Sequence, residues 1–192
     1  PLGPQFMRVF DVSSQQFGLI VSSYTFSAGF SGLIGAFFID RFDRKPALLT
    51  LYAGFAVGTG ICALAPTYEF LVGARLLAGF FGGVLGSLVL AIVGDVIPYA
   101  RRGAAMGVIT SAFSVASVAG VPTGLYIAAH LGWHATFLAL AGLCVLILLV
   151  AVWIVPSIRG HLVDSVSRRP LETLKVMLFN RSHIRVFLFV AM

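Results

Sequence analysis

The densest group of residues able to do chemistry is a polar run at positions 40–45, in which five of six residues are charged. It reads Asp40-Arg41-Phe42-Asp43-Arg44-Lys45. Carboxylates and guanidinium groups at this spacing can form charge-assisted hydrogen bonds with one another and can bind helix ends. The stretches 12–39 and 46–68 on either side contain no charged residue. Each is long enough to cross a bilayer, so the run is a tight hydrophilic turn at a membrane surface.

Two further charged residues, Arg75 and Asp95, lie on one apolar stretch that begins at Phe70. Arg75 is about 8 Å below the membrane surface at 1.5 Å per residue. An arginine left in hydrocarbon costs at least about 2.5 kcal/mol, so its side chain either faces a cavity or a buried partner, or extends to the interface. Asp95, near the other end, is either a solvated helix end or the partner of a cation. Since a carboxylate opposes the dipole at a helix C-terminus, Arg44 is its natural partner.

The polar candidates for lining a cavity with Arg75 are Tyr24, Thr110 and Ser114. Aromatic and hydroxyl side chains also pack helices together, so packing remains an alternative for each. An enzyme is not expected, because the sequence shows no paired carboxylates, metal-ligand cluster or activated nucleophile. His130 and His134 are better interpreted as interfacial residues than as metal ligands, and we expect neither a metal nor another cofactor.

The composition defines the elements that must position these residues. The chain is 59% hydrophobic and 10% charged, whereas an ordinary soluble domain carries roughly 25% charged residues. In lipid the backbone must satisfy its own hydrogen bonds, which leaves helices or a closed barrel. Residues 137–155 are continuously apolar and lack the alternating polarity of barrel strands. The sequence therefore predicts an all-α, polytopic membrane helical bundle.

The bundle is expected to cover residues 1–156, with residues 1–7 either the exit of a preceding helix or a tag remnant. Its spans are predicted at about 16–39, 47–64, 70–97, 104–129 and 136–155. The sequence 130–134, with Trp133 at the interface, divides the last two spans. Residues 157–182 are expected to form a linker with an amphipathic surface helix, since Pro170 suits a first helical position and apolar residues follow on one face. Residues 183–192 are expected to begin another span.

Basic residues are concentrated in three of the predicted loops, 40–46, 98–103 and 157–185, which hold 11 of the 13. The opposite loops, 65–69 and 130–134, hold none. This asymmetry places the three basic loops in the cytoplasm, and we expect a bacterial inner (plasma) membrane. The net charge of +6 then reflects topology and anionic lipid, and we expect no nucleic-acid partner.

Small residues recur every four positions on several spans. The stripes are Ser23, Ser27, Ser31 and Gly35; Gly79 and Gly83; Gly82 and Gly86; and Ala112, Ala116, Gly120 and Gly124. Such stripes let helix backbones approach closely. They serve either static packing or the sliding of helix faces that a transporter requires.

The segment 36–46 resembles the signature loop between the second and third helices of the major facilitator superfamily, Gly-x-x-x-Asp-Arg-x-Gly-x-Arg/Lys. The matching positions are Asp40, Arg41, Arg44 and Lys45. Ala36 and Asp43 replace its two glycines, so at Asp43 we expect either a left-handed backbone or a shifted turn.

Three further segments resemble motifs of the same family, in the same order. Residues 75–83, with Arg75, Gly79 and Gly83, resemble its fourth-helix Arg-x-x-x-Gly motif. The run Gly120-Val-Pro122-Thr-Gly124 resembles its fifth-helix Gly-Pro-x-x-Gly motif, which is associated with antiporters. Residues 133–137 resemble the start of its sixth helix.

The resemblance implies the N-terminal half of a twelve-helix solute transporter, from the end of helix one to the start of helix seven. It implies partners in the lipid bilayer, a small-molecule substrate, protons and the missing C-terminal half. It also implies a cytoplasmic conformational latch made of Asp40, Arg41, Arg44, Lys45 and Asp95.

Proton-coupled efflux is the leading hypothesis, because the antiporter motif resembles that of the drug and sugar efflux branch. No Asp or Glu lies at mid-membrane in the predicted spans, so a proton carrier would have to lie elsewhere in the protein. Two alternatives remain open. One is uptake or facilitated transport of a sugar or metabolite by the same fold. The other is a non-transporting membrane receptor or assembly protein.

Overall fold

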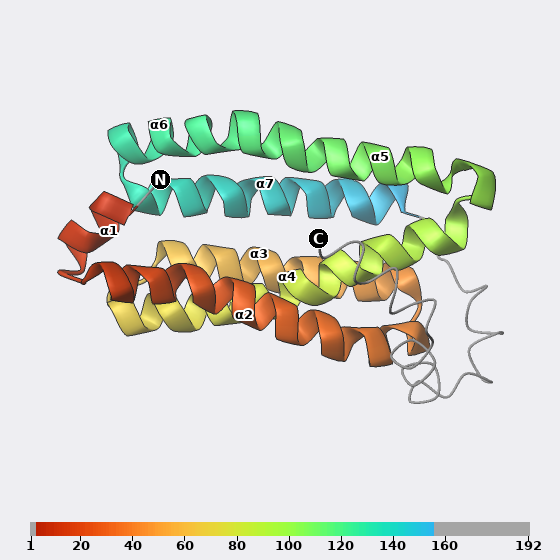
Figure 1. Cartoon of the computed structure of the whole chain (residues 1–192), viewed down its shortest axis with the longest axis horizontal. Helices are drawn as coiled ribbons and strands as arrows, with labels where there is room; N and C mark the ends of the chain where they lie inside the picture. Colours follow the sequence, from red (N-terminus) through yellow and green to blue (C-terminus); the bar gives the residue numbers. More distant parts are fainter. Residues whose placement is uncertain (1–2, 156–192) are drawn as a thin grey trace, which may run out of the picture.

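A computed structural model describes residues 3–155, apart from the side chains of Pro4, Ala36 and Asp40. Every regular element in this part of the chain is a helix (Figure 1). The elements are α1 (Gly3–Val9), α2 (Ser14–Phe38), η1 (Ile39–Arg41), α3 (Arg44–Ala63), α4 (Tyr68–Val96), α5 (Tyr99–Val115), η2 (Ala116–Gly120), α6 (Val121–Leu131) and α7 (Trp133–Ile154). The expected linker at 157–182 and the expected span at 183–192 lie outside the described residues.

Five helical stretches are long and apolar enough to cross a membrane. They are α2, α3, α4, α7 and the continuous stretch Tyr99–Leu131 formed by α5, η2 and α6. The predicted all-α membrane bundle is confirmed. The helices begin two to five residues before the predicted starts, because polar residues that were assigned to the turns form the first helical turns instead.

Side-chain caps determine where three of these helices begin. Ser13 forms a capping box with Gln16 at the start of α2, and Thr67 accepts from the amide of Phe70 at the start of α4. Asp43 caps α3 by accepting from the Lys45 amide at 3.1 Å. Its φ is −57°, so the left-handed backbone considered for Asp43 is not found. Only Phe42 and Asp43 separate η1 from α3, which makes the turn shorter than expected.

The long helices lie side by side with their axes roughly parallel (Figure 1). The stretch α5–α6 lies along one side and is followed by α7, and α3, α4 and α2 lie on the other side (Figure 1). Helix α4 packs against α2 and α3, and α3 also packs against α7. From Tyr99 to Ile127 no residue is buried by the described part of the chain. The packed core is therefore formed by α2, α3, α4 and α7.

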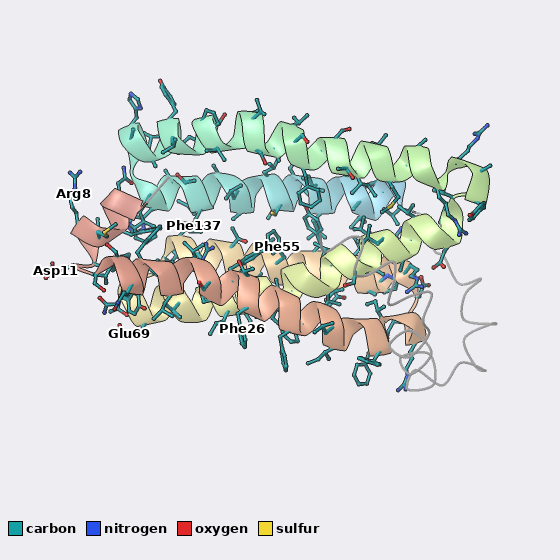
Figure 2. The ribbon with its side chains drawn as sticks, in the orientation of Figure 1. Arg8, Asp11, Phe26, Phe55, Glu69 and Phe137 are labelled. Atoms are coloured by element: carbon teal, nitrogen blue, oxygen red, sulfur yellow. The ribbon has the colours of Figure 1, made fainter. Side chains whose placement is uncertain are left out.

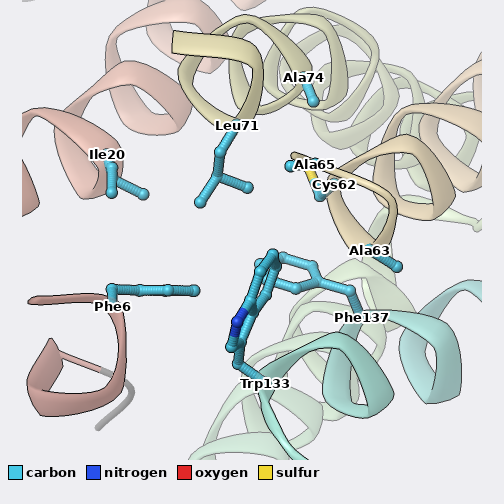
Figure 3. Packing of buried hydrophobic residues seen from close by; sticks show 9 residues of the cluster. All are labelled: Phe6, Ile20, Cys62, Ala63, Ala65, Leu71, Ala74, Trp133 and Phe137. Carbon is cyan, nitrogen blue, oxygen red and sulfur yellow. The ribbon is translucent and has the colours of Figure 1, made fainter. Parts of the chain in front are cut away.

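Helix α1 lies across one end of the bundle, where its Phe6 covers the start of α7. The rings of Phe6 and Trp133 meet edge to face at 5.2 Å, and Figure 3 shows Phe6 pointing toward Trp133 and Phe137. Trp133 is only 3% exposed. It is buried because α1 packs over it, and it lies at the start of α7, at one end of the bundle. Its place at the membrane interface stays a prediction. We call this the α1 end of the bundle.

The contact between α2 and α4 brings the two backbones together. A Cβ atom at Gly79 would collide with the carbonyl oxygen of Tyr24, and one at Gly83 would collide with that of Ala28. Ser27 and Ser31 cross the same contact, where their hydroxyls donate to the carbonyls of Leu76 and Gly79 at 2.6 and 3.5 Å. The serine stripe of α2 therefore lies against the glycine stripe of α4, and we call this contact the α2–α4 seam.

Candidate functional site

The end of the bundle opposite α1 is held together by an ion pair. The Nε of Arg44 donates to Oδ2 of Asp95 at 2.8 Å, and its Nη1 donates to the carbonyl of Ile39 at 3.3 Å. Arg44 is 3% exposed and Asp95 is 28% exposed. One guanidinium thereby joins the start of α3, the helix η1 and the last turn of α4. The pairing of Asp95 with Arg44 agrees with the sequence prediction.

Other basic residues at this end bind the carbonyls of helix C-termini. Lys45 donates from Nζ to the carbonyl of Val152, near the end of α7, at 2.9 Å. Arg102 donates to the carbonyls of Gly94 and Ile97, at the end of α4, at 2.7 and 3.0 Å. Cations in these positions satisfy carbonyls that lack helical partners and complement the helix dipole. Neither contact was predicted from the sequence, although the position of Arg102 shortly after the end of α4 was a usable signal.

The structure describes fewer contacts for the two remaining members of the predicted latch, Arg41 and Asp40. Arg41 is exposed and its guanidinium lies 5.5 Å from the ring centroid of Phe38. The backbone of Asp40 is part of η1, but its side chain lies outside the described part of the structure. We call the described residues Arg44, Lys45, Asp95 and Arg102 the basic-end cluster. The latch function predicted for Asp40, Arg41, Arg44, Lys45 and Asp95 stays a prediction.

A second polar site surrounds Arg75 inside the bundle. The Nε of Arg75 donates to the carbonyl of Ile20 at 2.6 Å, and the guanidinium lies 5.4 Å from the ring centroid of Tyr24. Both side chains line a cavity of about 200 Å³ between α2, α3, α4 and α7. Arg75 thus faces a cavity within the bundle, which was one of the two alternatives considered for it.

The other candidate lining residues are not part of this cavity. Thr110 and Ser114 lie on α5 and are exposed within the described residues. The hydroxyl of Thr110 donates to the carbonyl of Met106 in its own helix at 2.9 Å. Figure 2 shows Phe55 and Phe137 between the helices, and both line the cavity, whereas Phe26 points away from the bundle. The sequence did not identify Phe55 or Phe137, because their role depends on how α3 and α7 pair.

The antiporter-like motif lies at a helical irregularity within the fourth span, the stretch Tyr99–Leu131. A π-helical turn, Ala116–Gly120, immediately precedes α6, which carries Pro122 in its first turn. Proline has no N–H for the helical ladder and its ring crowds the carbonyl four residues earlier, so a widened turn accommodates it. Gly124 contacts α7, where Thr136 donates to its carbonyl at 3.3 Å. A Cβ atom at Gly120 would meet nothing within 4 Å among the described residues outside its own helix.

The two histidines both bond to backbone carbonyls. Nδ1 of His130 lies 2.9 Å from the carbonyl of Tyr126, and Nδ1 of His134 lies 2.6 Å from that of Ala63. Across residues 3–155, no three His, Cys, Asp or Glu side chains lie close enough together to hold a metal ion.

Comparison with known proteins places the whole chain in one family. The model of the Major Facilitator Superfamily matches residues 1–192. The chain is 36% identical over 141 residues to the uncharacterized MFS-type transporter YwfA of Bacillus subtilis, which covers 71% of the chain and 33% of the relative. It is 33% identical over 150 residues to the vacuolar membrane amino acid uptake transporter fnx2 of Schizosaccharomyces pombe, with 75% of the chain and 25% of the relative covered.

A third relative is the inner membrane transport protein YdhP of Escherichia coli, which is 28% identical over 148 residues, or 76% of the chain and 38% of the relative. The chain thus spans less than half the length of these curated relatives. The family match over all residues, the five apolar helices and the loop at 36–46 agree with one another. We conclude that this chain belongs to the Major Facilitator Superfamily.

Proposed function

We propose that this chain forms one helical half of a secondary active transporter that moves a small organic solute by alternating access. The observation that carries the proposal is the Arg44–Asp95 ion pair of 2.8 Å, in which a nearly buried guanidinium joins three helix ends. Contacts of this kind can hold one conformation and be given up in another. The names of YwfA, fnx2 and YdhP, all described as transporters or transport proteins, support the same proposal.

The energy of the ion pair suits a switch between two states. Removing one partner of a fully buried pair costs about 3–5 kcal/mol. Asp95 is 28% exposed, so solvent screening reduces that figure toward the few kcal/mol that separate the conformations of a two-state protein. In this proposal Asp40, Arg41 and Lys45 complete the latch on the cytoplasmic side, as the resemblance implies.

We further propose that transport is proton-coupled efflux through a bacterial inner membrane. The support is the similarity of Gly120, Pro122 and Gly124 to the antiporter motif. The acidic residues of the five spans, Glu69 and Asp95, lie at helix ends. A proton-carrying carboxylate would therefore belong to a part of the protein outside these spans.

Uptake is the second candidate, and one relative favours it. The name of fnx2 describes an amino acid uptake transporter. Uptake uses the same fold and the same latch, so the basic-end cluster does not distinguish it from efflux. The direction of solute flux relative to proton flux distinguishes uptake from efflux.

The test is flux through proteoliposomes that contain the full-length protein under an imposed pH gradient, with a panel of dyes, sugars and amino acids. We expect at least one solute to move against its gradient when protons move the opposite way. Flux that ignores the pH gradient would remove proton coupling, and flux in the same direction as protons would favour uptake. The absence of flux for every solute would favour a receptor or assembly protein instead.

A further inference from the structure

The cavity beside Arg75 has the size of a small-molecule site. It encloses about 200 Å³ between α2, α3, α4 and α7. For comparison, a dry engineered cavity of about 150 Å³ binds benzene. The space therefore accepts a ligand slightly larger than a single aromatic ring.

The walls of the cavity are mainly apolar. Phe55 and Phe137 contribute aromatic rings from α3 and α7, Ala78 contributes a methyl group from α4, and Cys62 and Cys144 contribute thiols. The hydroxyl of Thr59 also lines the cavity, but it already donates to the carbonyl of Phe55 at 2.8 Å. Such walls bind the body of an apolar ligand without supplying a specific hydrogen bond to it.

The single charged group in the wall is the guanidinium of Arg75. Its Nε donates a hydrogen bond to the carbonyl of Ile20, and the guanidinium lies over the Tyr24 ring. In residues 3–155 no carboxylate is paired with Arg75, since the acidic residues of that range lie at helix ends or in turns. A guanidinium has five N–H donors, and the hydrogen bond to Ile20 uses only the one on Nε, so the four on Nη1 and Nη2 are open to a ligand of the cavity that Arg75 lines.

We propose that this cavity binds a small organic monoanion, namely a carboxylate attached to an aromatic or branched apolar body. The two oxygens of a carboxylate match the fork of a guanidinium in a bidentate hydrogen bond. The pair removes an unpaired positive charge from a low-dielectric site, and the apolar body replaces water against the aromatic walls. The chemistry also defines what the cavity rejects. A neutral analogue leaves the guanidinium unpaired, and a cation or the ammonium group of an amino acid finds no acidic partner there.

The site lies inside the helical bundle, and its occupancy requires neither a gradient nor a second compartment. This inference is therefore separate from the proposal of transport. A protein that binds the anion but moves no solute would contradict the transport proposal and leave the binding site standing.

The test is equilibrium binding of radiolabelled benzoate to the purified full-length protein in detergent. We expect saturable binding of one benzoate per chain. Unlabelled phenylacetate should compete, whereas benzyl alcohol and benzylamine, which keep the ring but lack the carboxylate, should need at least tenfold higher concentrations. Equal competition by benzyl alcohol, or no saturable binding of benzoate, would overturn the proposal without any variant.

Variants then locate the site. Arg75→Gln should abolish the preference for benzoate over benzyl alcohol, and Arg75→Lys should retain part of it because the charge remains without the fork. Cys144→Leu fills the cavity while keeping Arg75, so it should weaken benzoate binding at least tenfold even if the Arg75 variants fold poorly. Arg8→Gln is the matched control, because Arg8 is an exposed arginine on α1, and its binding should equal that of the wild type. Wild-type binding by both Arg75→Gln and Cys144→Leu would place the anion elsewhere and refute the assignment.

Discussion

The α2–α4 seam predicts that the smallest possible substitution, Gly83→Ala, is less favourable than the same substitution elsewhere on α4. A Cβ atom at Gly83 would overlap the carbonyl oxygen of Ala28 and the hydroxyl of Ser31. The carbonyl belongs to the backbone of α2 and cannot rotate away, so the two helices must separate. In contrast, a Cβ atom at Gly73, ten residues earlier on the same helix, meets nothing within 4 Å in the described part of the chain.

The magnitude follows from comparing these two positions. Forcing one extra carbon into a closely packed contact costs about 1–3 kcal/mol, and replacing glycine by alanine inside a helix returns about 1 kcal/mol. Gly73→Ala should therefore stabilise the protein by up to about 1 kcal/mol, while Gly83→Ala should range from neutral to about 2 kcal/mol destabilising. Because the helix-propensity gain is common to both, the difference between the variants, about 1–3 kcal/mol, isolates the steric cost of the seam.

The assay is reversible unfolding of the full-length protein by titration with SDS in mixed micelles, followed by far-ultraviolet circular dichroism. Gly86→Ala is a second control, since a Cβ at Gly86 also meets nothing within 4 Å among the described residues. Equal free energies of unfolding for Gly83→Ala and the two controls would refute the conclusion that α2 and α4 are in backbone contact at this position.

Three other substitutions test the turn, the ion pair and the break between α6 and α7. Asp40→Asn should insert into the membrane normally but reduce transport in the proteoliposome assay, and wild-type flux would remove Asp40 from the latch. Arg44→Gln should cost about 2–3 kcal/mol in the SDS assay, at the lower limit for a buried ion pair because its carboxylate partner is partly exposed; a loss below about 0.5 kcal/mol, typical of a surface pair, would contradict the burial of Arg44. Gly132→Ala should cost about 1–3 kcal/mol, because Gly132 has φ 83° and ψ 165°, a region that side chains other than glycine rarely adopt. An unchanged free energy of unfolding for this variant would mean that the backbone between α6 and α7 can adopt another conformation at residue 132.

The membrane spans could be predicted because each depends on local sequence, and the Arg44–Asp95 pair could be predicted because both residues lie at helix ends on the same predicted side of the membrane. Apolar length defines a span, and the dipole of a helix C-terminus favours a cation beside Asp95. The cap at Asp43 was harder to predict, since a side chain that accepts from the amide two residues later competes with the left-handed turn of the family pattern. Both conformations suit an aspartate, and only the start of α3 at Arg44 distinguishes them.

The cavity could not be predicted, because its walls come from four helices whose register is set by packing. Phe55 and Phe137 look like ordinary apolar residues in the sequence, and they line the cavity only because α3 and α7 run side by side. For the same reason Thr110 and Ser114 were plausible partners of Arg75 by residue type alone. The structure places them on α5, away from the packed core.

Helix α4 connects the two candidate sites, since Arg75 and Asp95 lie on it about 30 Å apart at 1.5 Å per residue. Between them, Gly79 and Gly83 bring its backbone against that of α2. On its other side, a Cβ atom at Gly58 of α3 would lie only 2.9 Å from the Cα of Ala78.

Backbone contacts of this kind contain no flexible side chain that could absorb a displacement, so α2, α3 and α4 should move as one body. At Gly60 the backbone of α3 lies farther from α7, because a Cβ atom there would meet that of Ala141 at an ordinary 3.8 Å. Among the four helices around the cavity, α7 is therefore the wall that can yield when an anion enters or leaves. The bond from Lys45 to the Val152 carbonyl would then link that movement to the basic-end cluster.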